Sequence, residues 1–177
     1  MNIAKWDNAD RYDKQSEVVK QALATPNHSI NELLRLMRET GEPAIYLSGT
    51  RLDNDFCFGS DDVGILFSVL PKDAHAFTPG YHPGSTEIYV TFHGNLVMEC
   101  LENAKVRSKI VGANQVLVLA PGQCHRVRFE AQGEAASVIV KTNLTARPSV
   151  VRCDNCTYYP DKTTCPLYQR WSDDVQG

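Results

Sequence analysis

The spacing of apolar positions changes once along the chain, near residue 43. Before that point apolar residues recur at intervals of three and four, which is typical of one buried face of a helix. Residues 10–24 carry this pattern, and the capping box Ser29-Ile30-Asn31-Glu32 opens a second helical segment over Leu33–Glu39. We therefore expect residues 1–43 to form an N-terminal helical extension.

From Ala44 onward the period is two, which is typical of strands with one buried face. Turn-forming residues separate the apolar runs at intervals of about eight to twelve residues, as in antiparallel sandwiches and barrels. The predicted strands are Ala44–Leu47, Val63–Leu70, Glu87–Phe92, Leu96–Leu101, Val106–Val111, Gln115–Leu119, His125–Glu130 and Ala136–Lys141. We expect residues 44–147 to form one all-β barrel.

Residues 148–177 form a tail rich in cysteine, tyrosine and proline, in which the alternation ends. A segment of that size does not fold alone without a disulfide or a metal, so we expect it to pack on the barrel. Cys153 and Cys156 are spaced to chelate one ion from a single turn, and Cys165 adds a third thiolate. The tail is thus a candidate second metal site for zinc or iron.

The fourth ligand of such a site would come from elsewhere in the chain or from a partner chain. The candidates within this chain are Cys57, Cys124, Asp154 and Asp161. A cluster of reduced thiols, or a disulfide that pins the tail to the barrel, is the alternative interpretation of the same cysteines.

Composition and charge limit the classes of partner. The chain has 177 residues, of which 42% are hydrophobic and 22% charged, and its formal net charge is -3. That charge gives no general attraction to nucleic acid or to an anionic membrane. No apolar run approaches the roughly 20 residues of a spanning helix, and the first residues lack the signature of a secretory signal. We expect a cytoplasmic protein that binds neither membrane nor nucleic acid.

Two short segments carry the candidate chemistry. One runs from Gly80 to Glu87 and contains His82, and the other is Pro121-Gly122-Gln123-Cys124-His125. Glu87 opens a predicted strand, and the turn after His82 brings that histidine back beside it. A second hairpin of the same barrel can place His125 opposite this pair. Two imidazoles and one carboxylate on one side of a cation form the facial triad of non-haem iron sites.

These segments resemble the two motifs of the cupin superfamily, small β-barrels that bind a metal ion inside the barrel. The matching residues are His82, Glu87, Gly94, Gly122 and His125. Gly80 stands where the first motif histidine is expected, so that ligand is absent. Ala120 and Phe129 replace a proline and an asparagine of the second motif. The resemblance covers roughly residues 63–141, and it implies a double-stranded β-helix, or jelly-roll, barrel.

The pattern is also loosely similar to one cupin branch, the 3-hydroxyanthranilate 3,4-dioxygenases, whose iron is held by two histidines and a glutamate. Bacterial members of that branch carry a second iron in a Cys-rich appendage. Here His82 and Glu87 are one residue closer together, and only one Cys-x-x-Cys is present. By alternation Arg126 and Arg128 point away from the His125 face, so neither is assigned to a substrate carboxylate.

The resemblance implies a mononuclear-metal enzyme acting on a small organic molecule, in the first place an Fe(II)-dependent dioxygenase. The metal ligands would be His82, Glu87 and His125. Tyr89, on the same face of its strand as Glu87, would form a hydrogen bond to a ligand or to substrate. Two alternatives stay open: a non-redox lyase or isomerase with Zn, Ni or Mn at the same residues, and a non-catalytic ligand-sensing barrel whose cysteine tail responds to redox state or metal.

The predicted strand Glu87–Phe92 also presents an apolar outer face, formed by Ile88, Val90 and Phe92. Cupins commonly pair through such surfaces, so the resemblance together with this face predicts a homodimer.

Overall fold

The computed structural model describes residues 78–128, 133–143 and 150–176 without a gap, the strands at 44–48, 51–52, 55–58 and 63–70, and single positions between 29 and 38 and at 148. The helix expected over residues 10–24 lies outside the described residues. In the second expected helix, positions 31, 32, 34, 35 and 38 are helical, and the Glu32 amide donates to Ser29 Oγ at 3.3 Å.

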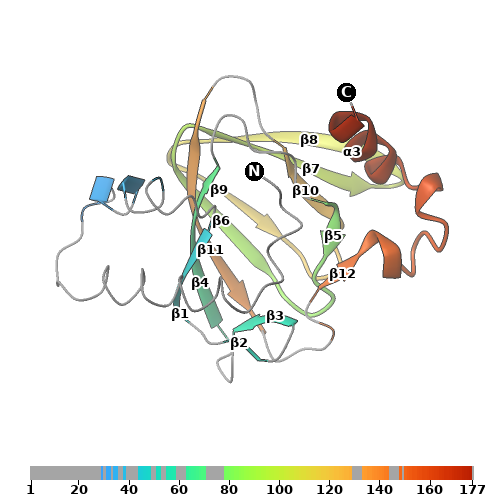
Figure 1. The fold of residues 1–177 in the computed structure, drawn as a ribbon, viewed down its shortest axis with the longest axis horizontal. Helices are drawn as coiled ribbons and strands as arrows, with labels where there is room; N and C mark the ends of the chain where they lie inside the picture. The colour runs from blue at the N-terminus through green and yellow to red at the C-terminus, as the bar shows by residue number, and fades with distance from the viewer. Residues whose placement is uncertain are drawn as a thin grey trace.

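Two five-stranded antiparallel sheets face each other (Figure 1). The first has the order β1 (Ala44–Ser48), β4 (Val63–Leu70), β11 (Ala135–Thr142), β6 (Glu87–His93) and β9 (Gln115–Leu119). The second has the order β12 (Val151–Arg152), β5 (Gly80–Tyr81), β10 (His125–Arg128), β7 (Asn95–Glu102) and β8 (Lys105–Gly112). A small hairpin pairs β2 (Arg51–Leu52) with β3 (Asp55–Phe58). The chain is therefore mostly β, as the alternation predicts.

Each predicted strand is present. Two have the predicted ends and the others end within one residue, except β10, whose last two predicted residues lie outside the described part. The sequence did not reveal β2, β3, β5 or β12. Three of these are two residues long, too short for any alternation to be read.

The inner faces of the two sheets share one apolar core. Its buried members are Tyr89, Leu96, Met98, Cys100, Val111, Leu119, Val127 and Ile139. On β6 the predicted inner residues Glu87, Tyr89 and Thr91 are all buried, whereas Val90 on the outer face is 38% exposed. The pleat of this strand therefore has the predicted orientation, which is what directs Glu87 into the barrel.

Gly94, between β6 and β7, is required by its surroundings. Its φ is +64°, and a Cβ at this position would lie 2.1 Å from the carbonyl oxygen of Glu134. Because that oxygen belongs to backbone beside β11, a side chain at Gly94 would separate β6 from its neighbour.

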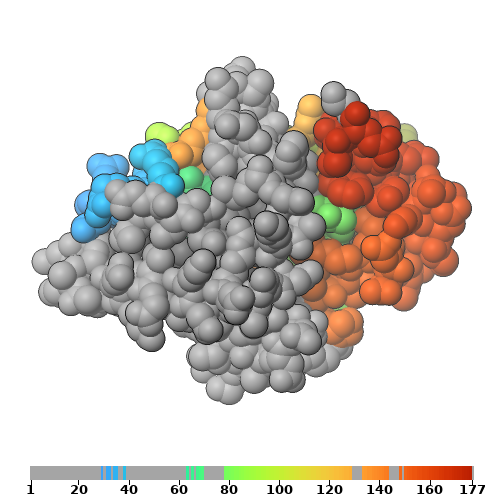
Figure 2. Space-filling model, viewed as in Figure 1, coloured from blue at the N-terminus to red at the C-terminus, as the bar shows by residue number. Residues whose placement is uncertain are grey.

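The tail has more regular structure than its sequence indicates. After β12 it forms two 3₁₀ turns, η2 (Cys153–Asn155) and η3 (Lys162–Thr164), and ends in helix α3 (Pro166–Gln176). The helix was not predicted, although Pro166 at its first position is a recognised start signal. The tail covers one side of the molecule (Figure 2, orange to red). Its Leu167 is inaccessible to solvent and packs with Tyr81 and Val151.

A buried ion cluster fixes α3 to the second sheet. Glu99 on β7 is 0% exposed and accepts from Arg126 Nε at 2.6 Å and from Arg170 Nε at 2.7 Å. Arg126 is 1% exposed and also pairs with Asp174 of the helix. Arg126 therefore does face away from the barrel interior, as alternation predicts, but the helix covers it.

Among the described residues, no helix combines the length and apolar character needed to cross a bilayer.

Removing the carboxylate at the centre of the ion cluster should destabilise the fold. Glu99→Ala leaves the buried Arg126 with Asp174 as its remaining partner, so we expect the free energy of unfolding to fall by about 3–5 kcal/mol in urea denaturation. The matched control is Glu102→Ala on the same strand, whose exposed pair with Lys109 should contribute at most about 1 kcal/mol. Equal losses in the two variants would contradict this account.

Candidate functional site

The structure brings together the three predicted metal ligands of the barrel. His82 follows β5, Glu87 opens β6 and His125 opens β10, so both sheets contribute. Nε2 of His125 lies 2.9 Å from one Glu87 oxygen, and Nε2 of His82 lies 3.4 Å from the other. The two imidazole centroids are 6.2 Å apart. Glu87 is 1% and His125 9% exposed, so the cluster lies inside the barrel.

The protonation of His125 follows from its second contact. Its Nδ1 lies 2.9 Å from the carbonyl oxygen of Gln123, and because a carbonyl oxygen only accepts, Nδ1 carries the proton. A neutral ring then presents the lone pair of Nε2 to the Glu87 carboxylate, which also has only lone pairs. Their 2.9 Å contact is repulsive unless Nε2 is protonated or a cation is shared between them.

Lys141, which the sequence analysis did not single out, supplies a positive charge at this site. It pairs with Glu87 across strands β11 and β6. Its Nζ lies 2.7 Å from Glu87 Oε1 and 3.1 Å from His82 Nε2. The alternation of β11 could have indicated that Lys141 faces the barrel interior, because it lies on the same face of the strand as Ser137 and Ile139. The pairing of β11 with β6, which sets Lys141 beside Glu87, cannot be read from one sequence.

Glu87 is a buried and ionised carboxylate. Burial raises the pKa of its carboxyl, but the positive charge of Lys141 and the contacts with His125 and His82 outweigh it and hold the pKa well below its ordinary value. Neither carboxylate oxygen forms a hydrogen bond of normal geometry with the described residues. A buried anion whose oxygens lack normal hydrogen bonds is suited to a cation as its partner.

Tyr89 lies on the same inner face, two residues beyond Glu87. Burial, and then the neighbouring Glu87 charge, raise the pKa of its phenol well above 10, so the hydroxyl stays protonated. It can therefore donate but not act as a phenolate. Its proposed hydrogen bond to a ligand or to substrate stays a prediction.

Gly80 is the residue at which the resemblance placed a further histidine, and the tail backbone crowds it. A Cβ at Gly80 would lie 2.9 Å from the Val151 carbonyl oxygen and 3.2 Å from Arg152 Cδ. Strand β12 is paired with β5 at this point, so the backbone leaves no room for a side chain. The tail thus leaves no room for a side chain at Gly80.

As the side chains stand, no group of three or more His, Cys, Asp or Glu residues in the described part of the chain is arranged to hold a metal ion. In the barrel, Lys141 Nζ lies against both Glu87 and His82. The donor set nevertheless fits a divalent ion, because two imidazole nitrogens and a carboxylate without normal hydrogen bonds converge. A metal would have to displace the ammonium group.

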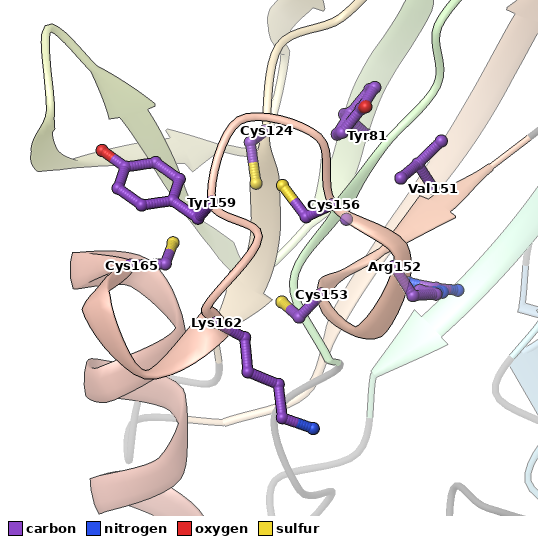
Figure 3. Close-up of a pocket in the computed structure, with 10 residues that line it drawn as sticks. Tyr81, Cys124, Val151, Arg152, Cys153, Cys156, Tyr159, Lys162 and Cys165 are labelled. Carbon is purple, nitrogen blue, oxygen red and sulfur yellow. The ribbon is translucent and has the colours of Figure 1, made fainter.

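The tail cysteines gather at a second place. Cys153, Cys156 and Cys165 line one cavity together with Cys124 of the turn before β10 (Figure 3). All four are free thiols. Burial, and then the neighbouring cysteines, raise the pKa of Cys153 to about 11 and of Cys124 to about 12. The thiols of Cys153 and Cys124 are therefore protonated at neutral pH when no cation is bound.

The other fourth-ligand candidates are placed differently. Asp154 pairs with Lys162, and Asp161 accepts hydrogen bonds from the amide and hydroxyl of Thr163. The side chain of Cys57 lies outside the described residues. Of the candidates from the sequence, Cys124 is the one that the structure brings to the tail cysteines.

Comparisons with known proteins find weak likenesses. No protein-family model and no curated protein matches the chain. Among solved structures, a cupin-like protein from Thermotoga maritima is 17% identical over 62% of this chain and 73% of its own, with a TM-score of 0.49. Oxalate oxidase in complex with the substrate analogue glycolate is 18% identical over 74% and 73%, with a TM-score of 0.47.

A third structure, the cysteine peptidase Peruvianin-I from Thevetia peruviana latex, is 13% identical over 51% of this chain, with a TM-score of 0.44. This chain spans 55% of its length. At these scores and identities the likenesses assign neither a family nor a function.

The depressed pKa of Glu87 predicts a specific dependence of stability on pH. Above its ordinary pKa of 4.5, ionised Glu87 stabilises the folded state chiefly through its ion pair with Lys141. That stabilisation is lost as the pH falls below 4.5 toward the folded-state pKa. In urea titrations with a chelator present, the difference in unfolding free energy between wild type and Glu87→Gln should shrink over this range. A difference that stays constant with pH would contradict the assignment.

Proposed function

We propose that the barrel binds one divalent metal ion through His82, Glu87 and His125 in a cupin-type site and acts on a small organic molecule. The leading form is an Fe(II)-dependent dioxygenase. A lyase or isomerase with Zn, Ni or Mn is the non-redox form. When bound, the metal would supply Lewis acidity and, if it is iron, redox chemistry with oxygen.

The observation that carries this proposal is the contact between His125 Nε2 and Glu87. With Nδ1 hydrogen-bonded to the Gln123 carbonyl, Nε2 is the ring nitrogen left for a metal, and it is held toward the carboxylate at 2.9 Å. Metal-binding histidines are commonly oriented by such a bond from the other ring nitrogen. A shared cation removes the repulsion between the two lone-pair donors without requiring a protonated ring.

Lys141 would have a role of its own in such an enzyme. Its ammonium group is displaced from Glu87 when an ion takes its place, but the lysine stays anchored on β11 beside the same carboxylate. From there it can pair with a negatively charged group of the substrate or give up a proton to it. Tyr89 can donate a hydrogen bond on the same face. We therefore favour an anionic substrate.

A second function is favoured by the same lysine. If Lys141 is the permanent partner of Glu87, the barrel holds no metal, and the protein is a non-catalytic ligand-sensing module. The contacts of Nζ with Glu87 at 2.7 Å and with His82 at 3.1 Å support this alternative. The two functions differ in whether the barrel binds an ion at all.

Metal titration separates them. Mn(II) suits nitrogen and oxygen donors better than thiolates, so it is a probe of the barrel and not of the tail. After treatment with a chelator, the wild type should bind one Mn(II) in calorimetry. His82→Ala and His125→Ala should weaken binding at least about tenfold, a loss of about 1.4 kcal/mol. His93→Ala, an exposed histidine of β6, should leave it unchanged. A wild type that binds no Mn(II) would exclude the metal enzyme.

Replacing Lys141 tests directly whether its ammonium group competes with a metal ion for Glu87. In Lys141→Met the ammonium no longer has to be displaced, so Mn(II) should bind about tenfold more tightly, equivalent to about 1.4 kcal/mol. Lys109→Met, which removes the exposed partner of Glu102, is the control and should have no effect on Mn(II) affinity. Unchanged or weaker binding in Lys141→Met would show that the lysine does not occupy the position of the ion.

A further inference from the structure

The four cysteines around the tail cavity come from two separate parts of the fold. Cys124 belongs to the turn that leads into β10 of the barrel, and the other three belong to the tail. Cys124, Cys153 and Cys165 are 8%, 7% and 4% exposed. Their sulfur atoms, and that of Cys156, point into the space between the tail loop, α3 and the barrel strands (Figure 3).

Backbone hydrogen bonds hold each of these cysteines in place. The Cys156 amide donates to the Cys153 carbonyl at 3.3 Å, and the Cys165 amide donates to the Lys162 carbonyl at 3.0 Å. Each of these bonds closes one tight turn that presents a sulfur. The barrel turn is fixed on both sides, since the Leu101 amide donates to the Cys124 carbonyl and the Gly122 amide to the His82 carbonyl, both at 2.9 Å.

Cysteines also form part of the apolar contact between the tail and the barrel. The buried cluster beneath it consists of Tyr81, Cys124, Val151, Cys165 and Leu167, so two of its five members are cysteines. Partly buried Leu101, Val106, Cys156, Tyr159 and Tyr168 pack against this cluster, so a third cysteine contributes to it. None of the described cysteines forms a disulfide.

We propose that Cys124, Cys153, Cys156 and Cys165 bind one tetrahedral Zn²⁺ ion and so clamp the tail to the barrel. Four thiolates and no open position make a closed, structural site. Zinc–sulfur bonds of about 2.3 Å place the sulfurs about 3.8 Å apart, so zinc binding requires the four side chains to move closer together than they lie here. Arg152 and Lys162 line the same cavity, although their charged groups are bound to the Thr78 carbonyl and to Asp154.

In this structure the thiols are not yet at coordinating positions. Cys153 Sγ, still protonated, donates to the Pro79 carbonyl at 3.4 Å. Zinc binding replaces the thiol protons with the metal, so this hydrogen bond is lost and protons are released to solvent. No oxidant or reductant is required, because sulfur and zinc keep their oxidation states.

Zinc binding at the four cysteines would also affect the barrel site, because one of them is next to His125 in the sequence. Cys124 directly precedes His125, and the Gln123 carbonyl between Gly122 and Cys124 orients the His125 ring. A metal bound to Cys124 therefore fixes the loop that carries one of the proposed barrel ligands. The zinc site itself does not depend on the proposed function of the barrel.

The test is elemental analysis of the full chain, with zinc released by a mercurial thiol reagent and captured by a chromogenic chelator. The wild type should release about one Zn²⁺ per chain. Cys124→Ser, Cys153→Ser and Cys165→Ser should each lose it, and His82→Ala should keep it. Loss of Mn(II) binding in His82→Ala with zinc retained would separate the two sites.

Wild-type protein provides a second readout that does not depend on folding of the variants. Replacement of zinc by Co(II) should give the intense visible absorption of a tetrahedral thiolate site, and the four thiols should react with a thiol reagent only after a chelator is added. Four thiols that react freely without metal release, or zinc that persists in Cys124→Ser, would overturn the proposal.

Discussion

The arrangement of the barrel interior depends on one buried negative charge. Glu87 is ionised, inaccessible to solvent and without a hydrogen bond of normal geometry among the described residues. A charge in that setting requires a positive partner, because desolvation costs several kcal/mol in real proteins. His82, His125 and Lys141 all approach it within 3.4 Å. The two proposed functions differ in whether the resident cation is the lysine or a metal ion.

The tail takes part in the same arrangement. Strand β12 closes the position where a further histidine would stand, at Gly80, and α3 completes the charge cluster of Glu99 and Arg126 on the other face of the second sheet. The turn that carries Cys124 continues directly into His125. The tail is therefore part of the structure that shapes the barrel site, and a zinc clamp at its cysteines would fix the tail and the His125 loop together.

The sequence predicted the strands and the convergence of His82, Glu87 and His125, because alternation and motif spacing are local signals, whereas their role as metal ligands stays a prediction. It missed Lys141, since the contact with Glu87 depends on the register of two strands far apart in the chain. It also missed α3. Leu167, Trp171 and Val175 recur at intervals of four residues in that helix, but only Leu167 is buried, and ion pairs of Arg170 and Asp174 with the sheet hold the helix in place. Cys124 could be singled out as the tail's neighbour only once the turn before β10 was seen packed against the tail.

The most direct test of the account is the anomalous scattering of a crystal of the protein grown with Mn(II). The account predicts one manganese peak bonded to Nε2 of His82, Nε2 of His125 and a carboxylate oxygen of Glu87, with Lys141 Nζ moved away from that carboxylate. Density without a peak at these atoms, and with Lys141 still 2.7 Å from Glu87, would show that the lysine is the resident cation and that the barrel is not a metal site.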